Sequence, residues 1–397
     1  MPGPRVDDTL DEDVRSLFSL PRDVAYLNTA YMGPLPLAAV EAGWMALDRK
    51  AHPWTVVADD FFAPGETYRG LVADLLGADA DGVAITPSVS YGLSTFASML
   101  AIERGQVVVV PAEEFPSNLI PWVVAAERVG AAVVRAPVTG EGGFTDALVA
   151  EIYRLGDRVA LVAAPPCHWT DGRPIDLVAV GRATRSVGAA LAVDVCQSLG
   201  AVPFDAAAVQ PDVVAGATYK WLLGPYSLGF AWFAPRWRDG LPIDHGWTNR
   251  AGAEDFTSLT ALADGYRAGA RRYDAGESAQ HTQMPVALAS LRLVSGWGPA
   301  ATALHARRLT DRIAEGATAL GLGVAPPEQR SSHLIGLHLA GTGLDAPTLA
   351  AHLADAQVHV SVRGPSVRIS AHRFNDDGDV DRLLASLAAA IRTPRSR

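Results

Sequence analysis

Between about residue 82 and residue 235, the chain alternates short runs rich in β-branched residues with stretches of helical period. The runs are GVAITPS, QVVVVPA, AAVVRAP, RVALVAAPP, AALAVDV, DVVAGAT and LGFAWFAP. Several are apolar throughout, which indicates strands covered on both faces by crossover helices. Intervening segments such as LIPWVVAAERVG carry apolar residues at i, i+3 and i+4 and end at glycine, as helices do. This alternation predicts an α/β fold with a mostly parallel, doubly wound sheet.

After about residue 285 the pattern changes to long helices followed by strand signals and a last helix. The helical stretches are PVALASLRLVSGW, TALHARRLTDRIAEGATAL and DVDRLLASLAAAIR, and the strand-like runs are HLIGLHLA, VHVSVRG and SVRISAH. A chain of 397 residues is long enough for two hydrophobic cores. We therefore predict a large α/β domain over residues 21–280 and a smaller α+β domain that combines residues 1–20 with residues 281–397.

Composition excludes several classes of function. The formal net charge of -10 argues against a nucleic-acid-binding protein. No apolar run is long enough to span a membrane, and the acidic N-terminus does not resemble a secretory leader, so we expect a cytoplasmic protein. Cys167 and Cys196 lie in apolar stretches, as reduced buried thiols do, and neither CxxC nor HExxH signals a metal site.

One lysine stands out at the end of a predicted strand. The chain has 33 basic residues, of which only Lys50 and Lys220 are lysines. Lys220 follows DVVAGAT, and ligands of open α/β sheets bind at the carboxyl ends of the strands. A desolvated lysine there can attack a carbonyl and form a Schiff base, which arginine cannot do. The alternative is a surface lysine that extends its amine into water.

Asp194 ends the apolar run AALAVDV, where an isolated carboxylate is costly without a cationic partner. The protonated ring nitrogen of a pyridine cofactor is such a partner. Gln197, three residues later, could donate a hydrogen bond to a ring oxygen of the same cofactor. The alternative for Asp194 is an aspartate that caps the next turn.

Three further stretches carry candidate ligands. Thr86, Ser88 and Ser90 in TPSVSYG precede a helix that begins near Tyr91, and hydroxyls at a helix N-terminus can bind phosphate or simply cap the helix. Phe115 follows VVVVPA and could lie on a planar cofactor, or belong to the core. Arg368, within SVRIS, suits a bidentate carboxylate contact, or a solvent-facing position.

In this order the motifs resemble the class-V aminotransferase family of fold-type-I pyridoxal-phosphate (PLP) enzymes. The family includes cysteine desulfurases, selenocysteine lyases, isopenicillin-N-epimerase-like proteins and kynureninases. The resemblance runs from about Tyr26 to Leu387 through YLNTAYMGPLP, EFPSNLIPW, VDVCQSLGAVPFD, TYKWLLGP, RRYDAGE and VRISAHRFNDDGDVDRLL. Its most specific part is the D-x-x-Q motif followed by the lysine segment.

The resemblance implies a role for each matched residue. Lys220 would form the Schiff base with PLP and move protons at the substrate Cα, while Asp194 would pair with the pyridine nitrogen. The other implied cofactor ligands are Gln197 at the ring hydroxyl, Phe115 against the ring, and Ser88, Val89, Ser90 and Tyr219 around the phosphate. The implied substrate ligands are Arg368 for the α-carboxylate and, around the pocket, Asn28, Tyr31, His168, Trp169 and Thr170. The family also implies a homodimer with its active sites at the subunit interface.

The sequence departs from the family pattern at three places. Desulfurases carry a persulfide-forming cysteine in a loop before the carboxylate arginine, but the stretch from Arg363 to Arg368 is short and has no cysteine. Ala217 stands where desulfurases often have a phosphate-binding serine. Glu277 replaces a threonine that contacts the partner subunit's phosphate in many relatives, so that contact is in doubt unless Ser278 substitutes.

The expected activity is therefore PLP chemistry at the Cα of an amino acid, with a lyase or desulfurase-like β-elimination that uses no persulfide cysteine as the leading hypothesis. Transamination, epimerisation and oxidative or decarboxylating deamination use the same anchoring residues and stay open. A non-enzymatic alternative is a silent PLP-fold sensor or scaffold. A nicotinamide dehydrogenase is a weaker alternative, because no GxGxxG opens a helix after a strand.

Overall fold

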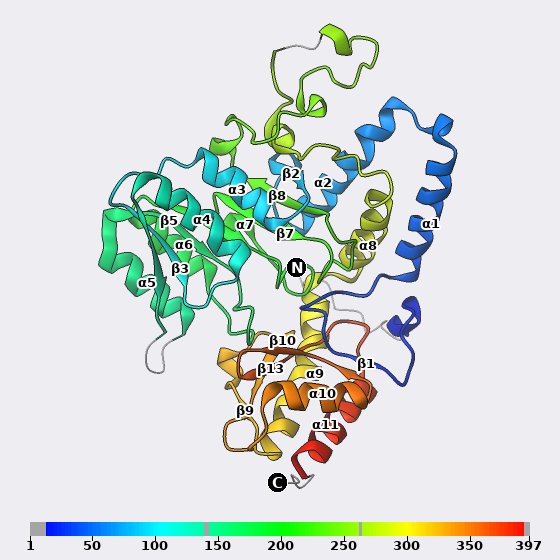
Figure 1. The fold of residues 1–397 in the computed structure, drawn as a ribbon, viewed down its shortest axis with the longest axis vertical. Helices are drawn as coiled ribbons and strands as arrows, with labels where there is room; N and C mark the ends of the chain where they lie inside the picture. The colour runs from blue at the N-terminus through cyan, green and yellow to red at the C-terminus, as the bar shows by residue number, and fades with distance from the viewer. Residues whose placement is uncertain (1–12, 139–142, 262–263, 393–397) are drawn as a thin grey trace, which may run out of the picture.

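The structure is a computed structural model that describes residues 13–138, 143–261 and 264–392 (Figure 1). Residues 1–12 of the predicted smaller domain lie outside the described residues. The largest sheet has seven strands in the order β2-β8-β7-β6-β5-β3-β4. Its strands are β2 (Val83–Thr86), β3 (Val107–Pro111), β4 (Ala132–Ala136), β5 (Val159–Ala164), β6 (Ala190–Asp194), β7 (Val213–Ala217) and β8 (Gly229–Phe233). Strand β8 is antiparallel to both neighbours and all other neighbours are parallel, so the predicted mostly parallel sheet is confirmed.

Helices cover both faces of this sheet, because successive residues of a strand point to opposite faces and the residues on both faces are apolar. Val108 and Val110 of β3 belong to a core with helices α3 and α4, whereas Val107 and Val109 belong to a core with α2, α5, α6 and α8. The helices of the larger part are α1 (Leu37–Ala51), α2 (Ala63–Leu76), α3 (Val89–Met99), α4 (Pro116–Val129), α5 (Phe144–Leu155), α6 (Leu177–Ser186), α7 (Ala206–Val209) and α8 (Met284–Trp297). The sheet is therefore doubly wound.

The C-terminal part is built on an antiparallel sheet of order β12-β13-β10-β9, drawn below the larger sheet in Figure 1. Its strands are β9 (Gly323–Val324), β10 (Leu334–His338), β12 (Ser361–Arg363) and β13 (Ser366–Ser370), and its helices are α9 (Pro299–Ala319), α10 (Ala346–Asp355) and α11 (Asp377–Arg392). Val367 and Ile369 pack in a core with residues of these helices. By the strand alternation, Arg368 faces the other way.

Two details differ from the sequence-based expectation. VHVSVRG is not one strand: β11 (Val358–His359) pairs in parallel with β1 (Ala25–Tyr26), and only β12 joins the four-stranded sheet. The chain changes partner at Val360, so the run is divided between two sheets. Because β1 pairs within the C-terminal part, the predicted boundaries at residues 20 and 280 stay a prediction.

A segment from Asn28 to Gly33 connects the two parts. Asn28 forms a backbone bridge with Ser370 of β13, and the Gly33 N–H donates to the Tyr219 carbonyl at 2.8 Å. A Cβ added at Gly33 would lie 2.1 Å from the Lys220 carbonyl oxygen, so only glycine allows this approach. The N-terminal segment is thereby fixed between the smaller sheet and the loop of Tyr219 and Lys220, which we call the lysine loop.

Candidate active site

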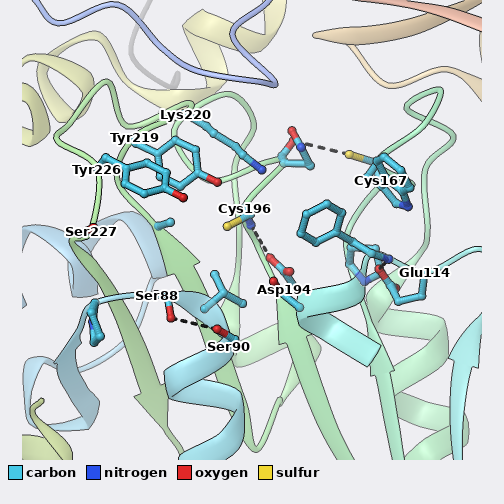
Figure 2. A pocket seen from close by; sticks show the side chains of 18 residues that line it. Ser88, Ser90, Glu114, Cys167, Asp194, Cys196, Tyr219, Lys220, Tyr226 and Ser227 are labelled. Atoms are coloured by element: carbon cyan, nitrogen blue, oxygen red, sulfur yellow. Dashed lines mark hydrogen bonds between the residues drawn. The ribbon is translucent and has the colours of Figure 1, made fainter. Parts of the chain in front are cut away.

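A pocket of about 380 Å³ lies at one edge of the seven-stranded sheet (Figure 2). The parallel strands end at this edge, and the antiparallel β8 begins there. Its walls come from the segments that follow β2, β3, β5, β6 and β7 and precede β8. The lining residues are Pro87, Ser88, Val89, Ser90, Glu114, Phe115, Ser117, Pro165, Cys167, Trp169, Asp194, Cys196, Gln197, Ala217, Tyr219, Lys220, Tyr226 and Ser227. The volume is in the range of small-molecule sites.

Lys220 projects its amine into this pocket (Figure 2). Its Nζ lies 5.6 Å from the centre of the Phe115 ring and 5.4 Å from that of Tyr219, and the residue is 7% exposed. Within the described ranges, the amine makes no hydrogen bond and no ion pair. The loop that carries it is fixed, since the Thr218 N–H donates to the Leu228 carbonyl at 3.0 Å. The amine is thus held in place by the backbone and left unpaired.

Asp194 is the last residue of β6 and is buried. Its Oδ1 accepts the Cys196 N–H at 2.8 Å. Burial raises the pKa of the Asp194 carboxyl, while the positive charge of Lys220 opposes that shift. A buried carboxylate with so little compensation calls for a cation in the pocket.

The N-terminus of α3 borders the pocket through Ser88 and Ser90. Ser88 caps the helix, because its Oγ accepts the Tyr91 N–H at 3.2 Å, and the two serine hydroxyls lie 3.0 Å apart (Figure 2). The positive end of the helix dipole and these hydroxyls together suit an anion such as a phosphate. Ring centres of Tyr219 and Tyr226 lie 4.7 Å apart on the neighbouring wall.

Phe115 and Gln197 lie in the pocket as the sequence predicts. The Phe115 ring meets the indole of Trp169 edge to face, with ring centres 5.3 Å apart. Gln197 uses both ends of its amide, since Nε2 donates to the Ala30 carbonyl at 3.1 Å and Oε1 accepts from Trp221 Nε1 at 3.1 Å. One hydrogen of Nε2 stays available for a ligand.

Arg368 lies mid-strand in β13 and is 1% exposed. Its Nη1 donates to the Trp169 carbonyl at 2.8 Å, whereas Nε and Nη2 have no hydrogen-bond partner within the described residues. Burial and the nearby Arg363 lower the pKa of Arg368 to about 9. Unpaired buried N–H groups on a guanidinium are poised for an anion.

Of the predicted substrate ligands, only Trp169 lines the pocket, and Arg368 reaches it through its hydrogen bond to the Trp169 carbonyl. His168 is fully buried, with Nδ1 2.7 Å from Thr170 Oγ1 and Nε2 3.1 Å from the Ala112 carbonyl, so the hydrogen-bonding groups of His168 are already used. Asn28 Oδ1 accepts a hydrogen bond from Ser361. Tyr31 is 57% exposed and interacts electrostatically with Arg363 and Tyr219. Substrate contacts by these four residues stay a prediction.

Several pocket residues were missed at the sequence level. Tyr226 and Ser227 precede β8, so their place depends on the antiparallel turn that follows the lysine. Cys196 follows Asp194 by two residues and could have been noticed from that spacing. Glu114 directly precedes Phe115, and burial together with the Asp194 charge raises the pKa of Glu114 to about 8.

The described residues form neither a metal cluster nor a membrane-spanning helix. No three His, Cys, Asp or Glu side chains in these ranges are grouped so that they could hold a metal ion. None of the helices in the same ranges is long and apolar enough to cross a bilayer.

Comparisons with known proteins identify the family of this chain. A probable cysteine desulfurase of Methanothermobacter thermautotrophicus is 32% identical over 227 residues, which cover 55% of each chain. Isopenicillin N epimerase of Streptomyces clavuligerus is 25% identical and covers 95% of this chain and 98% of its own. A solved lysine-to-alanine variant of the cystine C–S lyase C-DES, with glycine linked to the PLP cofactor, superposes with a TM-score of 0.84 at 21% identity over 94% of this chain and 98% of that chain. The family model for class-V aminotransferases matches residues 55–388, and the chain therefore belongs to this family of PLP enzymes.

Proposed function

We propose that this protein is a PLP-dependent enzyme that acts at the Cα of an amino acid, and that its reaction is a β-elimination. The observation that carries the first part is the unpaired amine of Lys220, which lies in a pocket lined by Asp194 and by the serines at the N-terminus of α3. Few sites other than one for a pyridine aldehyde phosphate combine an amine, an acid and an anion site in this way.

The residues present fit PLP. Lys220 would hold the cofactor covalently, and Asp194, whose buried carboxyl forms no ion pair with any described residue, would pair with the protonated ring nitrogen. Ser88, Ser90 and the N-terminus of α3 would hold the phosphate. Phe115 and Tyr219 supply apolar surface on either side of the amine.

Bound PLP supplies an electron sink for the charge that develops at the substrate Cα. Asp194 keeps that sink effective, because a carboxylate beside the ring nitrogen favours its protonated form. Arg368 would orient the substrate through its unpaired Nε and Nη2 groups. Lys220, whose amine points into the pocket, would take up and return the Cα proton.

The chain's cysteines support an elimination without a persulfide relay. Strands β12 and β13 are joined through Gly364 and Pro365 alone, so no cysteine lies between the arginines of this hairpin. Burial raises the pKa of the Cys167 thiol to about 12 and also raises that of Cys196. Since the thiolate is the nucleophile, both cysteines are poor sulfur acceptors.

Transamination, epimerisation and deamination are distinguished from β-elimination by their products. The experiment is a panel of amino acids incubated with the PLP-loaded protein, with ammonia, keto acid, sulfide and altered chirality scored together. β-Elimination predicts ammonia, keto acid and the released β substituent in equal amounts, without a second keto-acid substrate or an oxidant. If PLP binds but no amino acid is turned over, the protein is a silent PLP-fold module and the enzyme proposal is wrong.

The lysine assignment has its own test, because the chain has only one other lysine. Borohydride reduction of the PLP-loaded protein should attach the cofactor to Lys220, as read by peptide mass spectrometry. Lys220→Ala should lose the reducible adduct. Lys50→Ala, which changes an exposed lysine of α1, is the matched control and should retain it. An adduct that persists in Lys220→Ala, or one that is lost in Lys50→Ala, would contradict the assignment.

We further propose a homodimer whose interface includes the outer face of α1. Figure 1 shows α1 along one side of the molecule, where it packs against α8. Trp44, Met45 and Leu47 of this helix are 69%, 62% and 54% exposed, and nearby Trp54 is 77% exposed. Apolar residues gathered in this way are typical of a subunit interface. The cytoplasmic location stays a prediction.

A further inference from the structure

Two arginines share one face of the smaller sheet. In the antiparallel ladder of β12 and β13, Arg368 lies opposite Ser361, and Arg363 lies opposite Ser366. Because side chains alternate along a strand, Arg363 projects on the same face as Ser361 and therefore on the same face as Arg368. Diagonal neighbours of this kind have Cβ atoms roughly 7–8 Å apart, which long side chains can span.

Both guanidinium groups meet Trp169, a residue of the pocket wall. Arg368 donates to the carbonyl of Trp169 at 2.8 Å, while the Arg363 guanidinium carbon lies 5.7 Å from the centre of its indole ring. The two cations thus engage different ends of one residue. The two guanidinium groups therefore lie at two separate positions, each of which could contact a different group of a ligand.

Neither cation is neutralised by the protein. Across the described residues, no carboxylate lies within ion-pair distance of Arg363 or Arg368. Asp171, beside the same sheet face at Gly336, is already paired with Arg173 at 2.9 Å. Nε of Arg363 and both Nε and Nη2 of Arg368 are buried without a hydrogen-bond partner. Burial lowers the pKa of each arginine, and Arg363 lowers that of Arg368 further.

Two close, unneutralised and partly desolvated cations are costly unless an anion meets them. One substrate α-carboxylate satisfies one guanidinium in a bidentate contact. The second guanidinium then still lacks its counter-ion. This face of the smaller sheet therefore presents a site for two anionic groups.

We infer that the substrate is an amino acid with a second carboxylate on its side chain, and that Arg368 binds its α-carboxylate while Arg363 binds the second carboxylate. This inference rests on the proposed function, since it names the class of substrate for the same site. Arg363 is thereby a residue that determines specificity rather than one that takes part in the chemistry.

The test compares acids with their neutral amides on the PLP-loaded protein. Isothermal titration calorimetry gives dissociation constants for the pairs aspartate and asparagine, glutamate and glutamine, and 2-aminoadipate and its side-chain amide. We expect the acid of at least one pair to bind about tenfold more tightly or better, because a charge-assisted contact is worth this much. Arg363→Gln should bring that ratio close to one and leave the constant for the amide within about twofold of its original value.

Three variants control the result. Arg368→Gln should weaken both members of a pair alike, since both carry the α-carboxylate. Arg363→Lys keeps the charge and should keep part of the preference for the acid. Arg182→Gln changes an exposed arginine of α6 and should alter nothing. Thermal unfolding of each variant confirms that it is folded.

The outcomes separate this inference from the proposal on which it depends. If amino acids bind but no acid is preferred, or if Arg363→Gln weakens acid and amide equally, the two arginines hold one carboxylate and the inference is wrong. Loss of the preference in Arg363→Lys as complete as in Arg363→Gln would also overturn it. If no amino acid binds at all, the proposed function fails and the inference with it.

Discussion

Two acidic side chains, Asp194 and Glu114, lie buried in the pocket wall within electrostatic reach of each other. Oε1 of Glu114 accepts the N–H of Phe115 at 2.6 Å. Because burial and the charge of Asp194 raise the pKa of Glu114 to about 8, this side chain is protonated at neutral pH. Glu114 then adds no negative charge beside Asp194, so Asp194 is the carboxyl of this wall that would pair with a cationic ring.

Replacing Glu114 should change how stability depends on pH. In the cofactor-free protein, the folded state holds the Glu114 proton up to about pH 8, whereas the unfolded chain releases it near the ordinary value of 4.5. Between these values the folded state binds more protons, so the free energy of unfolding falls as pH rises, by up to about 1.4 kcal/mol per pH unit. Glu114→Gln should flatten this decline in urea unfolding between about pH 5 and pH 8. Equal slopes in the two proteins would contradict the prediction.

At the scale of elements, a buried ion pair joins three segments of the larger part. Arg69 of α2 donates through Nη1 to Asp274 at 3.0 Å, and Asp274 Oδ1 also accepts the Ile85 N–H of β2 at 2.8 Å. The segment Gly269–Tyr273 leads directly into Asp274. The carboxylate therefore fixes helix α2 and strand β2 against this connection.

Asp274→Asn should lower the free energy of unfolding by about 3–5 kcal/mol, because it removes the buried counter-charge of Arg69 and leaves only the partly exposed Glu66, 3.2 Å from Nε. Urea unfolding followed by circular dichroism measures the change. Asp239→Asn is the control: Asp239 pairs with Arg272 at 3.2 Å but is 94% exposed, so its loss should cost at most about 1 kcal/mol. Similar costs for both variants would show that burial of the pair does not matter.

The exposed face of α1 gives a test of the proposed homodimer. Leu47→Glu places a charge within the apolar face, so the dimer dissociation constant should rise by roughly tenfold or more. Sedimentation equilibrium measures that constant. Leu304→Glu changes a leucine of α9 that is even more exposed, at 68%, and should leave the dissociation constant unchanged. A monomeric wild-type protein would contradict the proposal outright.

At the scale of the whole molecule, two buried histidines lie where the smaller sheet meets the lysine loop. His372 is neutral in the fold, because its Nδ1 accepts the Arg373 N–H at 2.8 Å and its Nε2 faces the Trp221 carbonyl at 3.2 Å. His333 Nε2 lies 2.5 Å from the Gln197 carbonyl. Burial lowers the pKa of His372 to about 3 and that of His333 to about 4.

Acid should therefore weaken the fold. Below the ordinary histidine pKa of 6.5, both histidines become protonated in the unfolded chain, whereas His372 and His333 stay neutral in the folded protein. The free energy of unfolding therefore falls as pH decreases towards about 4, by up to about 1.4 kcal/mol per pH unit for each histidine. His372→Gln should show a shallower decline in urea unfolding from about pH 7 to pH 4.5. His52→Gln, at an exposed site after α1, should retain the full decline; the same slope in all three proteins would count against this account.

Much of this architecture was predictable because the strands of the large sheet are continuous apolar runs. Such runs mark strands of a sheet covered on both faces, and the strand-end rule then brought Asp194, Lys220 and Ser88 to one edge. The two-residue strands β1, β9 and β11 are too short to carry a period. Tyr226 was missed because its position depends on the antiparallel strand β8. Glu114 was missed because its raised pKa depends on burial and on the charge of Asp194.

The segment from Asn28 to Gly33 has a mechanical consequence. Through Asn28 it is bridged to β13, the strand of Arg368, and through Ala30 and Gly33 it is hydrogen-bonded to Gln197 and Tyr219 on the cofactor side. A displacement of the smaller sheet would therefore be transmitted to Gln197 and Tyr219 through this short segment, in which residues 29–31 form a turn. The strand that carries Arg368 and the loop that carries Lys220 are thus coupled, so a movement that opens one side of the pocket would displace the other.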